Sequence, residues 1–241
     1  HNLYKFPHKP IEFGVRSFNN NFSLGGSEQE SMQFYHNMRY SDSRISYRID
    51  GCSLQKEDDM EGAFEILAGS TLLDFYSVDF DEEIYISCDD KNRFEGGLFI
   101  AGEGGPTNIT RAGEFNVILN GKILLVRKSE CSKPNIALHE LLHSLGFDHS
   151  SNKNNIMFNI SNCGQVIGQD LLDLINELYV IPSQPDLTFE DVSASIKGKY
   201  LDVDVGIRNY GLRDSENFIL VISSEGNLKS PLHIILLLKE N

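Results

Sequence analysis

The segment from His139 to His149 constrains this chain more than any other, because it sets three histidines, a glutamate and a glycine at the spacing HExxHxxGxxH. At average residue usage, five such positions coincide by chance with a probability on the order of 10⁻⁴. Residues four apart on an α-helix share one face, so His139 and His143 can bind one metal ion together. The spacing therefore predicts a helix that carries two zinc ligands.

Two other residues of this segment complete the predicted site. Glu140 lies beside the histidines and need not bind the metal, so its carboxylate can take a proton from metal-bound water. Gly146 is expected to end the helix in a left-handed conformation, which turns the chain back so that His149 reaches the same ion. A lone histidine on an apolar helix face is usually a core residue, but this combination favours a zinc site.

With these residues the chain resembles the metzincin metallopeptidases, and among them the matrixins. His149 is followed by Ser150, and Met157 stands eight residues beyond His149, as in the methionine turn (Met-turn) of matrixins. The resemblance implies that Met157 forms a hydrophobic floor under the zinc without binding it. It also implies a peptide substrate, with an apolar pocket after the scissile bond that favours a hydrophobic residue there.

The resemblance implies a zincin-like α/β (α+β) catalytic domain over residues 38–181, with a twisted five-stranded mixed sheet and three helices. Residues 1–37 are rich in Asn, Ser and Gly and are interpreted as an N-terminal extension, with a short helix over residues 31–39. The domain's expected elements include strands over residues 44–49, 73–80 and 83–88, a helix over residues 54–67 closed by Gly69, and a closing helix over residues 169–179.

The chain departs from the matrixin pattern at three places. Met157 is followed by Phe158 and Asn159 where matrixins usually have Tyr-Pro, which implies a differently shaped pocket beside the zinc. Leu171 replaces an acidic residue of the closing helix, so no ionic anchor for a new N-terminus is expected there. No histidine lies between the first strand and the active-site helix, so we expect one catalytic zinc ion and no structural zinc.

Two further segments contain several glycines or a pair of residues typical of a turn. Residues 95–111 contain several glycines, and in a metzincin this region supplies the edge strand that pairs with an extended substrate. An ordinary loop is the alternative. Residues 115–126 surround Asn120-Gly121, a pair typical of a type I′ turn, and predict a hairpin. Asn135 is a candidate cap for the active-site helix that follows.

Charge limits the classes of partner. The net charge is −14 and the pI is about 4.9, so neither nucleic acid nor an anionic membrane is expected as the main partner. No apolar run of 18 residues predicts a membrane span, and no secretory signal is visible. Calcium could bind an acidic group without EF-hand spacing, although a solvated acidic rim is the alternative. That group comprises Asp79, Asp81, Glu82, Glu83, Asp89 and Asp90.

The four cysteines include no CxxC pair and allow three disulfide pairings. We favour Cys52–Cys88, because each cysteine follows a predicted strand and these two strands should be parallel neighbours. This choice leaves Cys131–Cys163, which joins the start of the active-site helix to the loop after the methionine turn. Four reduced thiols are the alternative.

Residues 182–241 are expected to form a linker and a β-rich module. Apolar and polar residues alternate over residues 200–207, after a proline-containing linker over residues 180–185. The segment resembles the start of a CARDB-type adhesion domain, which is an immunoglobulin-like β-sandwich. Such a sandwich needs about 100 residues, so the module is truncated or is completed by the catalytic domain or another chain. It is a candidate for contact with a protein or a cell surface.

Together these features predict an extracellular or cell-surface zinc endopeptidase that acts on extended peptides or proteins. His139, His143 and His149 would hold the zinc, and Glu140 would act as the general base toward zinc-activated water. One alternative is a catalytically quiet zinc-containing adhesion or binding protein, although such a protein does not need Glu140. A zinc hydrolase that acts on other bonds is the second alternative.

Overall fold

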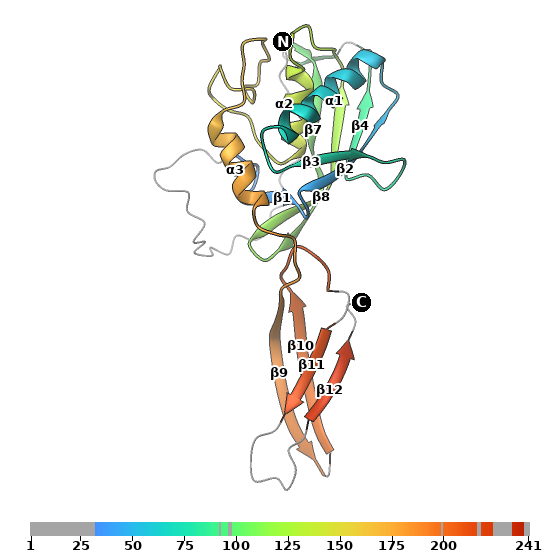
Figure 1. Ribbon diagram of the computed structural model, residues 1–241, viewed down its shortest axis with the longest axis vertical. Helices are drawn as coiled ribbons and strands as arrows, with labels where there is room; N and C mark the ends of the chain where they lie inside the picture. The colour runs from blue at the N-terminus through green and yellow to red at the C-terminus, as the bar shows by residue number, and fades with distance from the viewer. Residues whose placement is uncertain are drawn as a thin grey trace. The chain divides into compact units, whose positions relative to one another are not determined.

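The computed structural model describes residues 32–91, 93–95, 98–198, 200–215, 218–223 and 233–238. Most of the expected N-terminal extension, residues 1–31, lies outside the described residues. The chain divides into two compact units, residues 1–182 and 183–241, which Figure 1 colours by residue number. The division falls inside the proline-containing segment 180–185.

The first unit is built on a mixed sheet with the order β1-β8-β4-β2-β3, and β7 pairs with the other side of β8. Only the β7–β8 pairing is antiparallel. The sheet has six strands, one more than expected, because a three-residue strand pairs with the first half of β8. The strands are β1 (Met38–Tyr40), β2 (Arg44–Asp50), β3 (Asp74–Ser77), β4 (Ile84–Cys88), β7 (Gly102–Ala112) and β8 (Phe115–Leu125).

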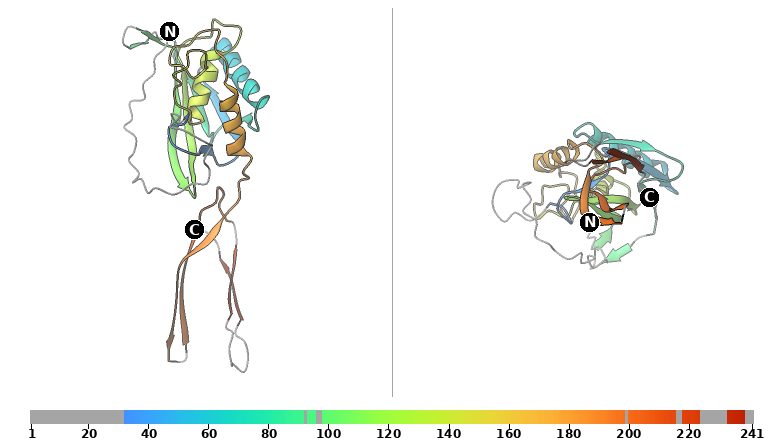
Figure 2. Two further views of the ribbon diagram at one scale, coloured as in Figure 1. Left: turned by 90° about the vertical axis from the view of Figure 1, so that its left-hand side faces the viewer. Right: turned by 90° about the horizontal axis from the view of Figure 1, so that it is seen from below.

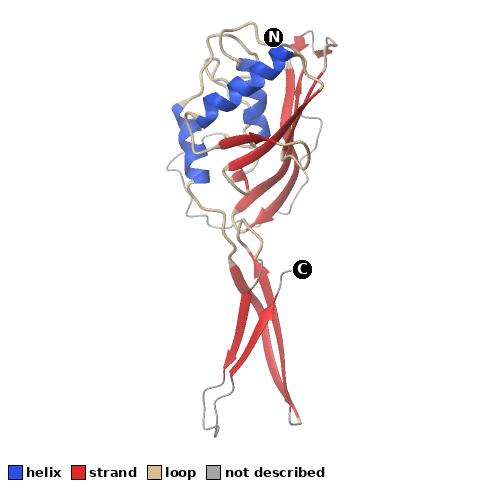
Figure 3. Cartoon of the chain, turned by 45° about the vertical axis from the view of Figure 1, so that its right-hand side comes forward, coloured by secondary structure: helices blue, strands red, loops and turns tan. Residues whose placement is uncertain are grey.

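Three helices lie on one side of this sheet (Figure 3). They are α1 (Leu54–Ala68), α2 (Asn135–Ser144) and α3 (Gln169–Tyr179). Helix α2 packs against β7, β8 and α1. Ile84 and Ile86 of β4 are fully buried and alternate with half-buried residues, and Leu141 and Leu142 of α2 are fully buried too. The predicted mixed α/β class is confirmed. Helix α2 lies at the centre of the first unit.

The predicted hairpin at Asn120-Gly121 is wrong. Both residues lie inside the continuous strand β8, and neither has the positive φ that a type I′ turn requires. The turn between β7 and β8 instead uses Gly113, with a φ of 55°. A Cβ at Gly121 would collide with the hydroxyl of Tyr40, so this glycine allows close packing and does not make a turn.

Two smaller predictions are also wrong. The described residues from 32 to 39 form no helix; Gln33 bridges to Phe147, and the chain enters β1 at Met38. Strand β8 and residues 146–148 offer these residues backbone partners, so their weak helical pattern does not decide their structure. Asn135 does not cap α2, because its side-chain amide donates to the carbonyl of Asn162 instead.

From Gly102 onward the glycine-rich segment forms a strand and not a loop. β7 begins at Gly102, and in the described residues it pairs with no strand except β8. Before it, β5 (Arg93–Glu95) and β6 (Leu98–Ile100) form a separate antiparallel pair. Gly96 and Gly97 lie outside the described residues.

Both predicted disulfides are present. Cys52–Cys88 joins the residues before α1 to the end of β4. Cys131–Cys163 joins the segment before α2 to the loop between Met157 and α3. The alternative of four reduced thiols is therefore wrong for this structure.

The second unit contains two antiparallel pairs of strands, visible in the left view of Figure 2. They are β9 (Leu187–Lys197) with β10 (Tyr200–Asn209), and β11 (Phe218–Ser223) with β12 (His233–Leu238). Backbone amides of Tyr210 and Leu212 donate to the carbonyls of Asp186 and Gln184. The immunoglobulin-like sandwich stays a prediction. Among the described residues, no helix has the length and apolar character needed to cross a membrane.

Candidate metal centre

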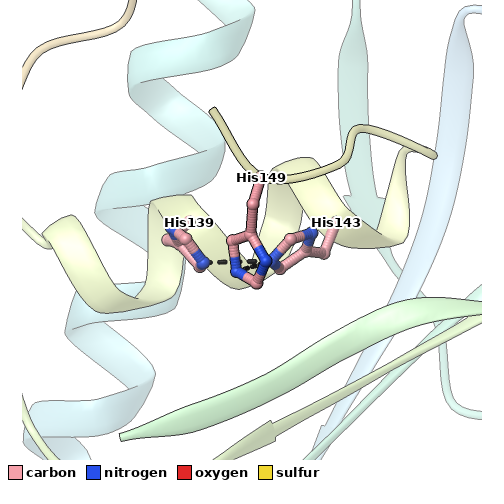
Figure 4. A group of neighbouring side chains, drawn as sticks. All are labelled: His139, His143 and His149. Carbon is pink, nitrogen blue, oxygen red and sulfur yellow. Dashed lines mark hydrogen bonds between the residues drawn. The ribbon is translucent and has the colours of Figure 1, made fainter. Parts of the chain in front are cut away.

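Three histidine rings converge at one point of the first unit (Figure 4). His139 and His143 lie one turn apart on α2, and His149 comes from the segment that follows the helix. Gly146 makes this return path with a φ of 96°, as the sequence predicted. A Cβ at Gly146 would also lie 2.8 Å from the Cβ of Met38, so the turn has no room for a side chain.

The separations of the ring nitrogens suit a shared metal ion. The Nε2 atoms of His139 and His143 are 2.9 Å apart, and those of His143 and His149 are 3.2 Å apart. Ligand atoms of all three residues lie within 4.8 Å of one another. Nitrogen ligands at the usual zinc distance in a tetrahedral site are separated by about 3.3 Å. The donor set and its spacing therefore fit zinc.

Hydrogen bonds fix the tautomers of the two helix histidines. Nδ1 of His139 lies 2.7 Å from the carbonyl oxygen of Ile156, and Nδ1 of His143 lies 2.7 Å from that of Phe147. A carbonyl only accepts, so each Nδ1 carries the proton and each Nε2 keeps its lone pair. Two lone pairs facing each other at 2.9 Å repel unless a cation lies between them.

Burial also keeps the three rings neutral. Loss of hydration lowers the pKa of His139 to about 4, and it lowers the pKa of His143 well below the usual value. The same cause lowers the pKa of His149. Neutral imidazole is the form that binds metal, so the site is ready for an ion near neutral pH.

Glu140, the residue after His139 on α2, is 3% exposed. Its side chain lies against β7, where a Cβ at Gly102 would be 2.6–2.9 Å from its carboxylate and Cγ. Its Oε2 is buried and accepts no hydrogen bond from the described residues. Burial, and then the nearby Glu103, raise the pKa of this carboxyl well above its ordinary value. A bound cation would oppose that shift.

A small pocket opens between the carboxylate and the segment after Met157. It has room for about one water molecule. Its lining consists of Gly102, Ile136, His139, Glu140, Phe158, Asn159 and Ser161. A small ligand in this pocket would contact His139 and Glu140.

The segment around Met157 is tied to the histidine cluster. The carbonyl of Ile156 accepts the bond from His139, and the carbonyl of Met157 accepts one from the backbone amide of Ser150. The Met157 side chain is 1% exposed and belongs to the core of the first unit.

Sequence reasoning missed the contacts that residues 32–36 make with the site. The carbonyl of Met32 accepts from the amide of Asp148, and the amide of Phe34 donates to the carbonyl of Gly146. The Phe34 ring stacks on His143 with centroids 5.8 Å apart. No pattern in the sequence of residues 32–36 predicts these contacts. The glycines of β7 were visible in the sequence, but their role beside α2 was not.

The acidic residues between 79 and 90 do not gather into a cation site. Glu82 pairs with Arg48 at 2.9 Å, and Glu83 accepts from the hydroxyl of Ser46 at 3.0 Å. Over the part of the chain that the structure describes, the histidine cluster is the only such group of metal-binding side chains. No observation supports calcium.

Comparison with known protein families matches residues 16–180 to the matrixin model. The match spans the first unit from before β1 to the end of α3. A comparison with curated proteins found no match.

Proposed function

The chain belongs to the matrixin family of metallopeptidases, and from this we propose that it is a zinc-dependent endopeptidase that cuts internal peptide bonds. One observation carries the proposal. Three histidine Nε2 atoms, at least two of them unprotonated, converge beside a buried carboxylate, Glu140, whose Oε2 accepts no hydrogen bond from a described residue. This combination is what metal-assisted hydrolysis requires.

Each residue has a distinct role in the proposed reaction. His139, His143 and His149 hold the ion, and Met157 supports the site from the core. Bound zinc would lower the pKa of a water molecule toward about 7 and polarise the scissile carbonyl. Glu140 takes the proton of the attacking water and passes it to the nitrogen of the leaving amine. Burial excludes bulk water and strengthens these interactions.

An extended peptide is the substrate form that the sheet suits. In the described residues β7 pairs only with β8, so its outer edge offers backbone groups to an added strand. The pocket beside Glu140 is lined by Ile136 and Phe158, and it would receive the side chain after the scissile bond. These apolar residues support a preference for an apolar side chain.

Two observations support an extracellular or cell-surface location and a role for the second unit in binding. Both disulfides are of the kind that persist in oxidising compartments. Exposed apolar side chains on β9 and β11, namely Phe189, Val192, Ile219 and Val221, favour contact with another protein. A catalytically quiet binding protein is the alternative, and the presence of Glu140 counts against it.

Replacement of Glu140 by alanine is the direct test. The zinc-loaded protein should make internal cuts in a mixed peptide library, and a chelator should stop them. Glu140→Ala should bind one zinc ion per chain and lose at least about 1,000-fold in kcat, because the proton acceptor is gone. Mass spectrometry of the library and metal analysis of both proteins measure this. Cuts that persist in the variant would contradict the assignment of Glu140.

A further inference from the structure

One wall of the pocket is a loop without regular structure. The wall loop, residues 158–165, contributes Phe158, Asn159 and Ser161 to the pocket, opposite Ile136 and Glu140 of α2. From residue 159 to residue 165 the chain forms neither helix nor strand. Its own backbone therefore does little to hold it in place.

The wall loop is fastened to the start of α2 instead. Cys163 is joined covalently to Cys131, four residues before the helix. The side-chain amide of Asn135, which is 1% exposed, donates to the carbonyl of Asn162 at 2.8 Å. Both attachments lead to the helix that forms the opposite wall, so they hold the two walls together.

Gln165 fixes the shape of the loop between these attachments. It is 2% exposed, and its Oε1 accepts from the amide of Asn162 at 2.9 Å. Its Nε2 donates to the carbonyl of Ile160 at 2.9 Å. The pocket between the walls has room for about one water molecule.

We propose that the Cys131–Cys163 disulfide, together with Asn135 and Gln165, sets the size of the side chain that the enzyme accepts after the scissile bond. The disulfide holds the pocket narrow, so alanine enters and leucine does not without movement of the wall loop. This inference rests on the proposed endopeptidase function. Cys131, Cys163, Asn135 and Gln165 are positioning residues and do not touch the reacting atoms.

The experiment compares peptides that differ only in the residue after the scissile bond, alanine or leucine. The wild type should favour alanine about tenfold in kcat/KM, because overpacking a filled site is costly. Cys131→Ser/Cys163→Ser should reduce this ratio at least about fivefold, through a lower KM for the leucine peptide at similar kcat. Cys52→Ser/Cys88→Ser is the matched control, since it opens a loop of 36 residues instead of 32. Its ratio should stay at the wild-type value.

Two results overturn the proposal: a wild type that prefers leucine, or an unchanged ratio in folded, zinc-loaded Cys131→Ser/Cys163→Ser. If that variant does not fold, Asn135→Ala and Gln165→Ala replace it, and a ratio unchanged in both overturns the proposal equally.

A binding measurement separates this inference from the proposed function. Dissociation constants of both peptides for zinc-loaded Glu140→Gln, which keeps the volume of this pocket-lining side chain, are measured with and without the Cys131–Cys163 disulfide and give the selectivity ratio without turnover. A wild type that binds the alanine peptide selectively but cuts neither peptide contradicts the proposed function alone. Equal binding of both peptides, in a protein that does cut, contradicts the inference alone.

Discussion

At the scale of single residues, the site depends on the absence of side chains as well as on their chemistry. Gly104 lies against the backbone of Glu140, and Gly102 lies against its carboxylate. Both glycines let β7 approach α2 more closely than any other residue would. The carboxylate of Glu140, the proposed general base, is therefore positioned from β7 as well as from its own helix.

Gly102→Ala tests this positioning. The added methyl would lie within 2.6–2.9 Å of the Glu140 side chain, so the carboxylate must move away from its present place. We expect kcat to fall at least about tenfold with one zinc ion still bound, because a small displacement of a catalytic group is costly. Steady-state kinetics and metal analysis measure both quantities.

Gly62→Ala is the matched control. Its new Cβ would lie 3.5 Å from Pro134, an ordinary contact, and it lies inside α1 where alanine stabilises a helix. Its kcat should equal that of the wild type. An equal kcat for Gly102→Ala would show that the carboxylate does not depend on this glycine.

At the scale of helices and strands, the sequence predicts an element correctly where its local residue pattern agrees with the pairing and packing of that element in the fold. β4 and α1 have clear periodicity, and the structure contains both near their expected ends. β8 was predicted as two short strands because Asn120-Gly121 favours a turn when only local preference is considered. Pairing with β7 along its whole length, and with β1 and β4 in turn, keeps β8 extended.

The difference between local pattern and long-range contact also explains which site residues could be predicted. His139, His143 and Gly146 are defined by spacing along one helix and its end, so the sequence contains the information. Phe34 and Gln165 act through contacts between segments far apart in the chain, and no local pattern marks them. Asn135 was noticed, but its partner was not predictable because that partner belongs to an irregular loop.

The end of α3 is fixed to β1 by one buried arginine. Arg39 is 1% exposed, and its guanidinium donates to the carbonyls of Leu178 and Ile181. It also lies 4.6 Å from the centroid of the Tyr179 ring. Arg39 thus satisfies carbonyls that a helix end otherwise leaves without donors.

Arg39→Ala should reduce the free energy of unfolding by about 3 kcal/mol, because these buried carbonyls lose their donors and the arginine stem leaves a cavity. Urea denaturation of the zinc-loaded protein measures the change. Arg44→Ala is the control: Arg44 and its partner Asp74 have side chains 67% and 66% exposed, so the loss should be under about 1 kcal/mol. Similar losses for the two variants would contradict the role given to Arg39.

At the scale of the whole molecule, metal binding and folding are linked. The three histidines come from α2 and from the segment after it, so an unfolded chain offers no comparable site. An ion that binds only the folded state stabilises it by about 4 kcal/mol at 1,000 times its dissociation constant.

Removal of the metal should therefore lower the Tm of the first unit by roughly 10 °C, and added zinc should restore it. Scanning calorimetry with and without a chelator measures the shift. The control is His149→Ala, whose Tm should change little on chelation because the site has lost a ligand. A Tm of the wild type that does not respond to chelator or zinc would contradict a bound ion.

The central position of β8 has a consequence for biosynthesis. β1 pairs only with β8 among the described strands, and β8 leaves the ribosome about 75 residues later. At ordinary translation rates this delay is about 4 to 15 s. During that interval β2, β3 and β4 can associate, while β1 lacks its partner strand. Residues 32–34 dock later still, because their partners are residues 146–148. In the nascent chain β1 therefore stays unpaired until the first half of β8 has emerged.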